Sequence, residues 1–207
     1  VVESSYSVRM CLDGWCRVRV RFVTAIHLWN KQTGVINVDG GTDYRLRVLE
    51  QAELYHWPLD EFADTSLTAS FTSLVPDVHE TMKDTEINIE GRAICARYLC
   101  EDVIWFDFMA LCAGPRSQND YIVIAMEFHQ VLISDIPELT ERYEDQARRF
   151  INLVDEFYDR SVKLIISAEK SIHQLYSGQR LTFEFERTQS RLLEMQSHEY
   201  WSRPHKP

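Results

Sequence analysis

The chain has 207 residues and a net charge of −10, with 32 acidic side chains against 22 basic ones. Proteins that bind nucleic acid through its phosphates need an excess of clustered Lys and Arg, so this balance argues against nucleic acid as the main partner. Hydrophobic residues make up 45% of the sequence, and no apolar run approaches the roughly 20 residues of a membrane-spanning helix, which indicates a soluble globular protein.

The first part of the chain carries short strand and helix patterns. Residues 17–22 alternate Arg with apolar residues, which is typical of an exposed edge strand. Residues 34–41 predict a strand closed by a Gly-Gly turn, and residues 46–55 have helix-like apolar spacing that Pro58 ends. Residues 1–16 carry little pattern.

The middle of the chain predicts a helix followed by a β-hairpin. Sparse apolar residues between 60 and 83 favour a helix and then a loop. The stretch from 84 to 108 favours strands, because apolar residues alternate and many are β-branched or aromatic. Glu90 and Gly91 are expected to form the turn between two of these strands.

The last part of the chain predicts alternating helices and strands. Ser117 begins a helix with the spacing of a capping box, although Asp stands where Glu or Gln is usual. Strands are expected at 129–133 and 162–167 with a strong helix at 143–160 between them, an order that implies a parallel pair with a right-handed crossover. A final helix is expected at 183–201.

The acid pair in LVDEF invites comparison with the acids that bind Mg²⁺ and activate water in ATPases. The apolar residues around it recur at i, i+3, i+4 and i+7, which is one face of a helix. We therefore interpret Asp155 and Glu156 as helix residues off the apolar stripe, facing solvent or a basic neighbour. They are not predicted to be catalytic.

Three arginines near the start form the first candidate group for chemistry. Arg17, Arg19 and Arg21 alternate with apolar residues and so share one face of a strand. They form either a solvated edge that blocks strand addition or the source of an arginine finger, a guanidinium supplied to the γ-phosphate of a neighbouring subunit. The residues alone favour the solvated edge.

Two further arginines form the second candidate group. Arg148 and Arg149 open the helix predicted at 143–160, where the helix dipole disfavours cations. Their position therefore suggests an anionic partner, either a local acid such as Glu144 or a nucleotide phosphate. Ordinary surface salt bridges explain the pair at least as well from the residues alone.

Other catalytic patterns are missing from the sequence. No G-x-x-x-x-G-K-[ST] loop occurs, so the chain has no recognisable backbone cradle for ATP phosphates. The seven histidines show no metal-binding spacing, and the five cysteines contain no C-x-x-C pair. We expect no metal site, reduced and mostly buried thiols, and no independent hydrolase.

Long segments of the chain resemble the C-terminal part of ZapE-type P-loop ATPases, a family of AAA+ proteins. The matching text from Ile36 onward is INVDGGTDYRLRVLEQAEL, FDFMALCAGPRSQNDYI, ARRFINLVDEFYDRSVKLIISAE and RTQSRLLEMQSHEYWSRPHKP. The resemblance begins near Phe22, covers most of the chain and is similar in detail to gammaproteobacterial members.

The resemblance implies an α/β fold made of three parts. Residues 1–58 would form the end of an AAA+ core, with residues 1–16 atypical. Residues 59–112 would form an insert with a β-hairpin, and residues 113–207 a helix-rich α/β region that ends in a long helix. ATP and Mg²⁺ would act in the complete protein, and this chain alone would hold neither.

The resemblance also assigns roles to the two arginine groups. The family has an arginine-finger motif just before this region, and the matching text here is DGWCRVRVRF, so one of Arg17, Arg19 and Arg21 is the expected finger. Arg148 stands where a second sensor arginine of AAA+ proteins is expected, with Arg149 as the runner-up.

In biological terms, the resemblance implies a cytoplasmic ATPase that acts at the bacterial division septum. It would destabilise the FtsZ ring, have FtsZ or other division proteins as partners, form a homo-oligomer in the complete protein and lie peripheral to the inner membrane. Without a phosphate loop, this chain alone is predicted to be inactive. The alternative is a non-enzymatic interaction module or a truncated remnant, and the start at Val1 without Met agrees with a missing beginning.

Overall fold

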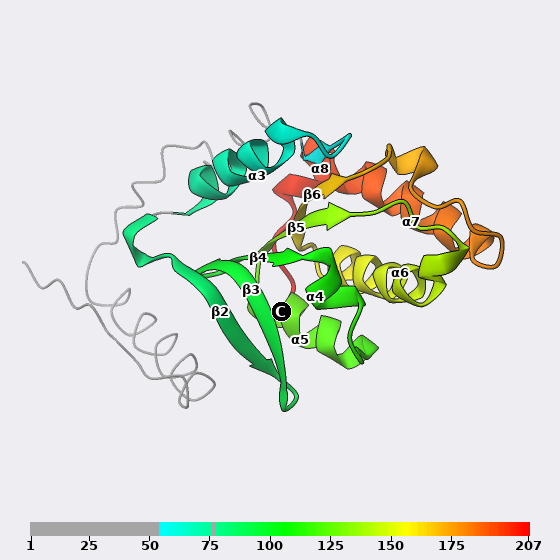
Figure 1. The fold of residues 1–207 in the computed structure, drawn as a ribbon. Coiled ribbons are helices and arrows are strands. Elements are labelled where there is room, and N and C mark those ends of the chain that lie inside the picture. Colours follow the sequence, from blue (N-terminus) through cyan, green and yellow to red (C-terminus); the bar gives the residue numbers. More distant parts are fainter. Residues whose placement is uncertain (1–53, 76–77) are drawn as a thin grey trace, which may run out of the picture. The chain divides into compact units, whose positions relative to one another are not determined.

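A six-stranded sheet with the strand order β1-β6-β5-β4-β3-β2 organises the chain (Figure 1). The computed structural model describes residues 54–75 and 78–207, which all belong to one unit. The elements predicted at 17–22 and 34–41, and most of the helix predicted at 46–55, lie outside the described residues. The strands are β1 (Tyr55–His56), β2 (Met82–Ile89), β3 (Arg92–Cys100), β4 (Val103–Asp107), β5 (Gln130–Ile136) and β6 (Lys163–Ala168).

The strands β1, β6, β5 and β4 run parallel to one another, whereas β3 and β2 continue the sheet as an antiparallel hairpin. The predicted strand–helix–strand order is confirmed, because β5 and β6 are parallel neighbours joined by α6 (Glu144–Asp159). Every residue of β6 is buried, as expected for a parallel strand covered on both faces. The mixed α/β fold predicted from the sequence is therefore present. The three predicted segments each contribute to this sheet, and their boundaries stay a prediction.

Helices lie on both sides of the sheet (Figure 1). The helix α3 (Glu61–Leu74) contacts β4, β5 and β6. On the other side, α6 packs against α4 (Phe108–Cys112), α5 (Gln118–Glu127) and α7 (Thr182–Met195). No helix in the described part of the chain has the length and apolar character needed to cross a membrane.

Each long helix follows a local sequence signal. Asp60 caps α3, because its Oδ1 accepts hydrogen bonds from the backbone N–H groups of Phe62 and Ala63 at 3.0 Å. The capping box predicted at Ser117 is confirmed, since the carboxylate of Asp120 accepts from the Ser117 N–H at 2.6 Å and α5 begins at the next residue. On α6 the apolar stripe around LVDEF is fully buried, as interpreted from its spacing: Phe150, Leu153, Val154 and Phe157.

The predicted hairpin turn is also present. β2 and β3 pair in register from Ile89 opposite Arg92 to Met82 opposite Leu99. Between them Glu90 and Gly91 have φ values of 52° and 77°, and positive φ at both central residues is what a type I′ turn requires. The twist of such a turn matches that of the two strands, so it fixes their register.

Two sequence predictions are corrected by the structure. Tyr55 lies in β1 and pairs with Ile166, although its spacing predicted a helix; the distant pairing with β6 decides its conformation. The single helix predicted at 183–201 is two helices, α7 and α8 (His198–Ser202). The chain breaks between them because the Ser197 hydroxyl accepts a hydrogen bond from the Tyr200 N–H at 3.2 Å and starts a new helix.

Candidate functional site

The two arginines predicted to contact phosphate lie one turn inside α6. The helix starts at Glu144, and Glu144 and Asp145 occupy its first turn, where negative charge complements the helix dipole. Arg148 and Arg149 follow them, so they do not open the helix as predicted. Their environment, not the dipole, therefore decides what each of them does.

Arg149 is half-buried and holds a neighbouring helix. Its Nη1 donates a hydrogen bond of 2.8 Å to the carbonyl oxygen of Cys112, the last residue of α4. A cation at this end of a helix compensates for the unpaired carbonyl groups. Burial raises the pKa of the Cys112 thiol to about 12, although Tyr121 and Arg149 both act to lower it, so the thiol is neutral and unreactive near pH 7.

Arg148 is exposed and forms no ion pair or hydrogen bond with any residue in 54–75 or 78–207. Glu144, the local acid that was the alternative partner, pairs instead with Arg180, whose Nη1 lies 2.9 Å from Oε2. The helix that carries Arg148 is fixed by its buried stripe. The structure thus separates the two candidates: Arg149 is engaged in the fold, whereas Arg148 has no bonded partner within the described residues.

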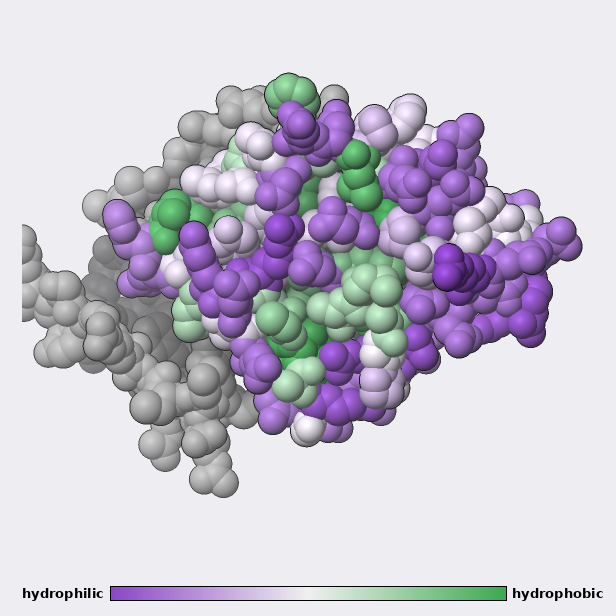
Figure 2. Space-filling view, in the orientation of Figure 1, coloured by the Kyte–Doolittle hydropathy of each residue, from purple (hydrophilic) through white to green (hydrophobic). Residues whose placement is uncertain are grey.

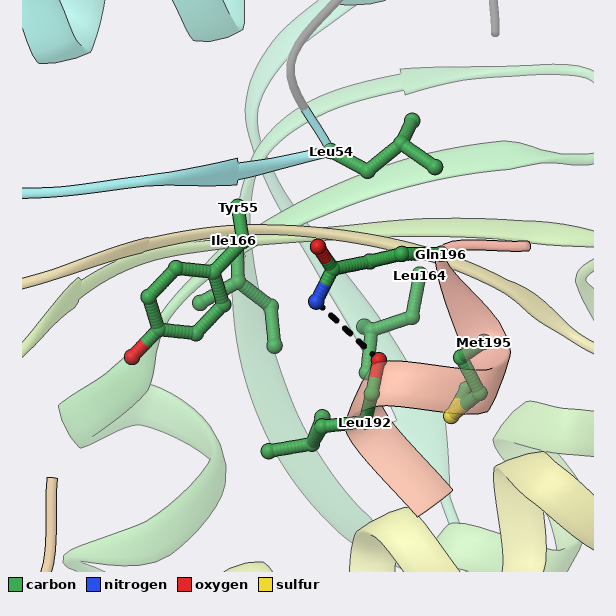
Figure 3. Close-up of a pocket in the computed structure, with 7 residues that line it drawn as sticks. All are labelled: Leu54, Tyr55, Leu164, Ile166, Leu192, Met195 and Gln196. Atoms are coloured by element: carbon green, nitrogen blue, oxygen red, sulfur yellow. Dashed lines mark hydrogen bonds between the residues drawn. The ribbon is translucent and has the colours of Figure 1, made fainter. Parts of the chain in front are cut away.

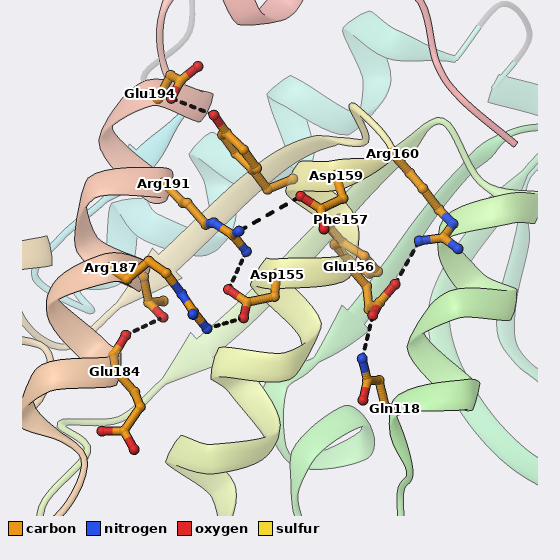
Figure 4. A network of polar contacts seen from close by, with 12 residues as sticks. Gln118, Asp155, Glu156, Phe157, Asp159, Arg160, Glu184, Arg187, Arg191 and Glu194 are labelled. Atoms are coloured by element: carbon orange, nitrogen blue, oxygen red, sulfur yellow. Dashed lines mark hydrogen bonds and ion pairs between the residues drawn. The ribbon is translucent and has the colours of Figure 1, made fainter.

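The acids of LVDEF are bound within the fold, as Figure 4 shows. Asp155 accepts hydrogen bonds from Arg187 and Arg191 of α7. Glu156 accepts from Arg160 and from Gln118, each at 2.6 Å. Their carboxylates neutralise arginines, so the interpretation as helix residues beside basic neighbours is confirmed.

Part of the contact between α6 and α7 is a polar seam of ion pairs and hydrogen bonds (Figure 4). Besides the pairs of Asp155, the Tyr158 hydroxyl donates to Glu194 at 2.6 Å, and Arg203 reaches the same carboxylate at 2.8 Å. Arg187 and Arg191 are four residues apart, which places them on one helix face. That spacing was the available signal.

A small hollow lies near α7 in the described part of the chain. Figure 3 shows this hollow between β1, β6 and the end of α7. The amide nitrogen of Gln196 is engaged with the Leu192 carbonyl oxygen at 3.1 Å. The lining is otherwise apolar: Leu54, Tyr55, Leu164, Ile166, Leu192 and Met195.

Two further sequence predictions concern the arginine finger and a metal site. Arg17, Arg19 and Arg21 lie outside the described residues, so the position of an arginine finger stays a prediction. Within the described ranges, no group of three or more His, Cys, Asp or Glu side chains is placed to hold a metal ion.

Comparison with known sequences identifies the family. Residues 15–204 match the family described as AFG1-like ATPase. The chain belongs to this family. No solved structure gives a significant match.

Three curated relatives illustrate the similarity. The chain is 43% identical over 187 residues to cell division protein ZapE of Escherichia coli K12, covering 90% of this chain and 49% of the relative. It is 28% identical over 216 residues to lactation elevated protein 1 homolog B of Danio rerio, covering 88% of this chain and 43% of that protein. It is 30% identical over 158 residues to the Schizosaccharomyces pombe protein C115.02c, covering 76% and 35%. The chain therefore spans less than half the length of each of these relatives.

Proposed function

We propose that this chain is the C-terminal part of an AAA+ ATPase that binds and hydrolyses ATP with Mg²⁺ when the region is joined to a phosphate-binding loop. Membership of the AFG1-like ATPase family supports the proposal. The observation that carries it is the exposed guanidinium of Arg148, which has no bonded partner among the described residues and lies on a helix packed by its buried stripe.

Arg148 has the chemistry that a sensor of bound nucleotide needs. A guanidinium is always charged and offers a planar set of donors that matches phosphate oxygens. The buried stripe of α6 fixes the backbone, and Arg149 anchors the same turn to the end of α4. A shift of Arg148 on contact with a nucleotide phosphate would therefore move α4 and α6 together.

The biological role we propose is bacterial cell division. The E. coli relative is named a cell division protein, which supports this assignment. In the complete protein the ATPase would act as a homo-oligomer in the cytoplasm, at the septum beside the inner membrane, and would destabilise the FtsZ ring. One of Arg17, Arg19 and Arg21 would supply the arginine finger to the neighbouring subunit.

A surface feature favours a second candidate function, a non-enzymatic interaction module. Hydrophobic side chains gather over α4 on an otherwise mostly hydrophilic face (Figure 2). Met109 of α4 is 47% exposed, and flexible methionines are common at protein-binding surfaces. On this alternative the region would bind a partner protein without affecting nucleotide turnover.

The test of the first proposal is a chimera. Residues 15–204 would replace the matching C-terminal part of E. coli ZapE, and ATP turnover would be measured for the chimera and for its Arg148→Ala variant. We expect the variant to lower kcat by about tenfold or more, because a charge-stabilising donor is lost. Its thermal unfolding temperature should stay unchanged, since Arg148 has no partner in the described part of the fold.

Arg142→Ala is the matched control. Arg142 is an exposed arginine six residues earlier, in the short helix η3 (Glu141–Tyr143). Its replacement by Ala changes the net charge by the same amount as Arg148→Ala. Equal turnover of both variants would refute the sensor role of Arg148. A stably folded chimera that hydrolyses no ATP but binds a division protein through Met109 and its neighbours would favour the interaction module.

A further inference from the structure

The last five residues of the chain lie against three separate elements. The Nε2 atom of His205 is 2.7 Å from the carbonyl oxygen of Ala125 in α5, and the N–H of Lys206 donates to the Arg160 carbonyl oxygen, just after α6, at 2.9 Å. The ring of His205 also lies 4.1 Å from the ring of His129, which immediately precedes β5. We call residues 203–207 the C-terminal strap.

Arg203 and His205 are the half-buried residues of the strap, and its other three residues are exposed. Its hydrogen bond to a carbonyl oxygen requires Nε2 to carry a hydrogen, so Nδ1 is the atom that takes up a second proton. A protonated His205 would then place a positive charge in a partly desolvated position. Protonation of His205 is therefore expected to weaken the contacts of the strap.

Basic side chains lie around His205. The ring of His129 lies beside it, tilted by 35°. Lys163, almost fully buried at the start of β6, donates to the carbonyl oxygens of Tyr200 and Arg203 at 2.8 Å. Asp102 is the nearby counter-charge and lies 2.8 Å from Nδ1 of His129. The titratable side chains that act on the charge of His205 are His129, Lys163 and Asp102. Arg203 of the strap is paired with Glu194 at 2.8 Å.

We propose that the C-terminal strap is a pH-dependent clasp, closed on α5, α6 and the start of β5 while His205 is neutral and released when His205 is protonated. The imidazole pair, the hydrogen bond to Ala125 and the buried ammonium of Lys163 define its closed state. Release uncovers two backbone carbonyl groups and the amino-terminal ends of β5 and β6.

The direction of the pH dependence follows from the environment. Burial lowers the pKa of His205 below its ordinary value of 6.5, and His129 and Lys163 lower it further, against the opposing effects of the Ala125 carbonyl and Asp102. The closed strap therefore binds the proton less well than the released strap does. Its contribution to stability is complete above about pH 6.5 and is lost as the pH falls below that value.

The test is hydrogen exchange of the intact chain at pH 7.5 and pH 5.5, corrected for the intrinsic rates, with the peptide that contains Lys206 as the readout. We expect the protection of this peptide to fall several-fold at the lower pH. In His205→Gln, the side-chain amide still donates to Ala125 but takes up no proton, so protection should be independent of pH. Equal protection of the unmodified chain at both pH values would overturn the proposal.

A control and a second measurement complete the test. His198→Gln removes an exposed histidine of α8, seven residues from His205, and should leave the pH dependence unchanged. An NMR titration of the unmodified chain should give a pKa for His205 below its ordinary value, with strap resonances changing in the same pH range. A His205 pKa at or above the ordinary value would contradict the clasp even if the Gln variant folded poorly.

Discussion

Adjacent arginines on α6 have opposite roles because a helix turns by about 100° per residue. Arg148 projects to solvent, whereas Arg149 reaches the end of α4 and binds the Cys112 carbonyl oxygen. The same side-chain type is therefore a structural donor at one position and, among the described residues, an unpaired cation at the next. At the residue scale, a contact across 37 positions of sequence decides which of the two remains available to a phosphate.

Asp155 offers a prediction at the same scale, because one carboxylate holds two arginines of α7. Asp155→Ala leaves Arg187 and Arg191 without this partner, and hydrogen bonds to charged groups contribute about 2 kcal/mol to stability. We expect the free energy of unfolding in urea to fall by about 2 kcal/mol. The loss should be smaller in high salt, since the site is partly exposed.

Asp159 provides the comparison for Asp155. Its carboxylate is 62% exposed and lies 3.8 Å from Arg191, so the pair belongs to the class of surface salt bridges that contribute little. Asp159→Ala should therefore change the free energy of unfolding by less than about 0.5 kcal/mol. Similar losses for both variants would show that the polar seam does not depend on Asp155.

At the element scale, the sequence predicted those structures whose signals are local. The stripe of α6 and the alternation that ends in the Glu90-Gly91 turn needed only neighbouring residues, and both were found. β1 has two residues and exists through its pairing with β6, so helix-like spacing misled the prediction at Tyr55. The break before α8 depends on one hydroxyl, that of Ser197, within an otherwise continuous helical pattern.

The hairpin turn gives the prediction at this scale. Glu90 has a positive φ of 52°, which Asn tolerates better than Glu, whereas Gly91 at 77° needs glycine. Glu90→Asn should raise the free energy of unfolding by about 0.5 kcal/mol, and Gly91→Ala should lower it by about 1 kcal/mol. Thermal unfolding of both variants checks this. Because an added Cβ at Gly91 would meet nothing within 4 Å, any loss there reports backbone strain and not a clash.

At the scale of the whole molecule, the sheet joins parts of the chain that the sequence analysis had separated. The parallel strands β1, β6, β5 and β4 are neighbours in the sheet although they are far apart in the sequence. The β2–β3 hairpin joins the same sheet because β3 pairs with β4. The candidate site, too, was predicted only in part, because it also depends on contacts between distant parts of the chain. Periodicity placed Arg148 and Arg149 on a helix, but the choice between them required the packing of α4 against α6.

The last prediction concerns the ATP affinity and ATP turnover of the whole chain. A single arginine contacting a phosphate contributes about 1.5–3 kcal/mol, whereas a Kd of 1 mM already requires about 4.1 kcal/mol. Since the sequence has no phosphate loop to add to Arg148, residues 1–207 alone should bind ATP with a Kd weaker than about 1 mM. Phosphate release in Mg²⁺ and ATP should equal that of buffer, measured on a sample whose folding is verified by circular dichroism. Turnover that coelutes with the chain through two different columns, and that disappears in Arg148→Ala but not in Arg142→Ala, would overturn this prediction and place a complete nucleotide site within the chain.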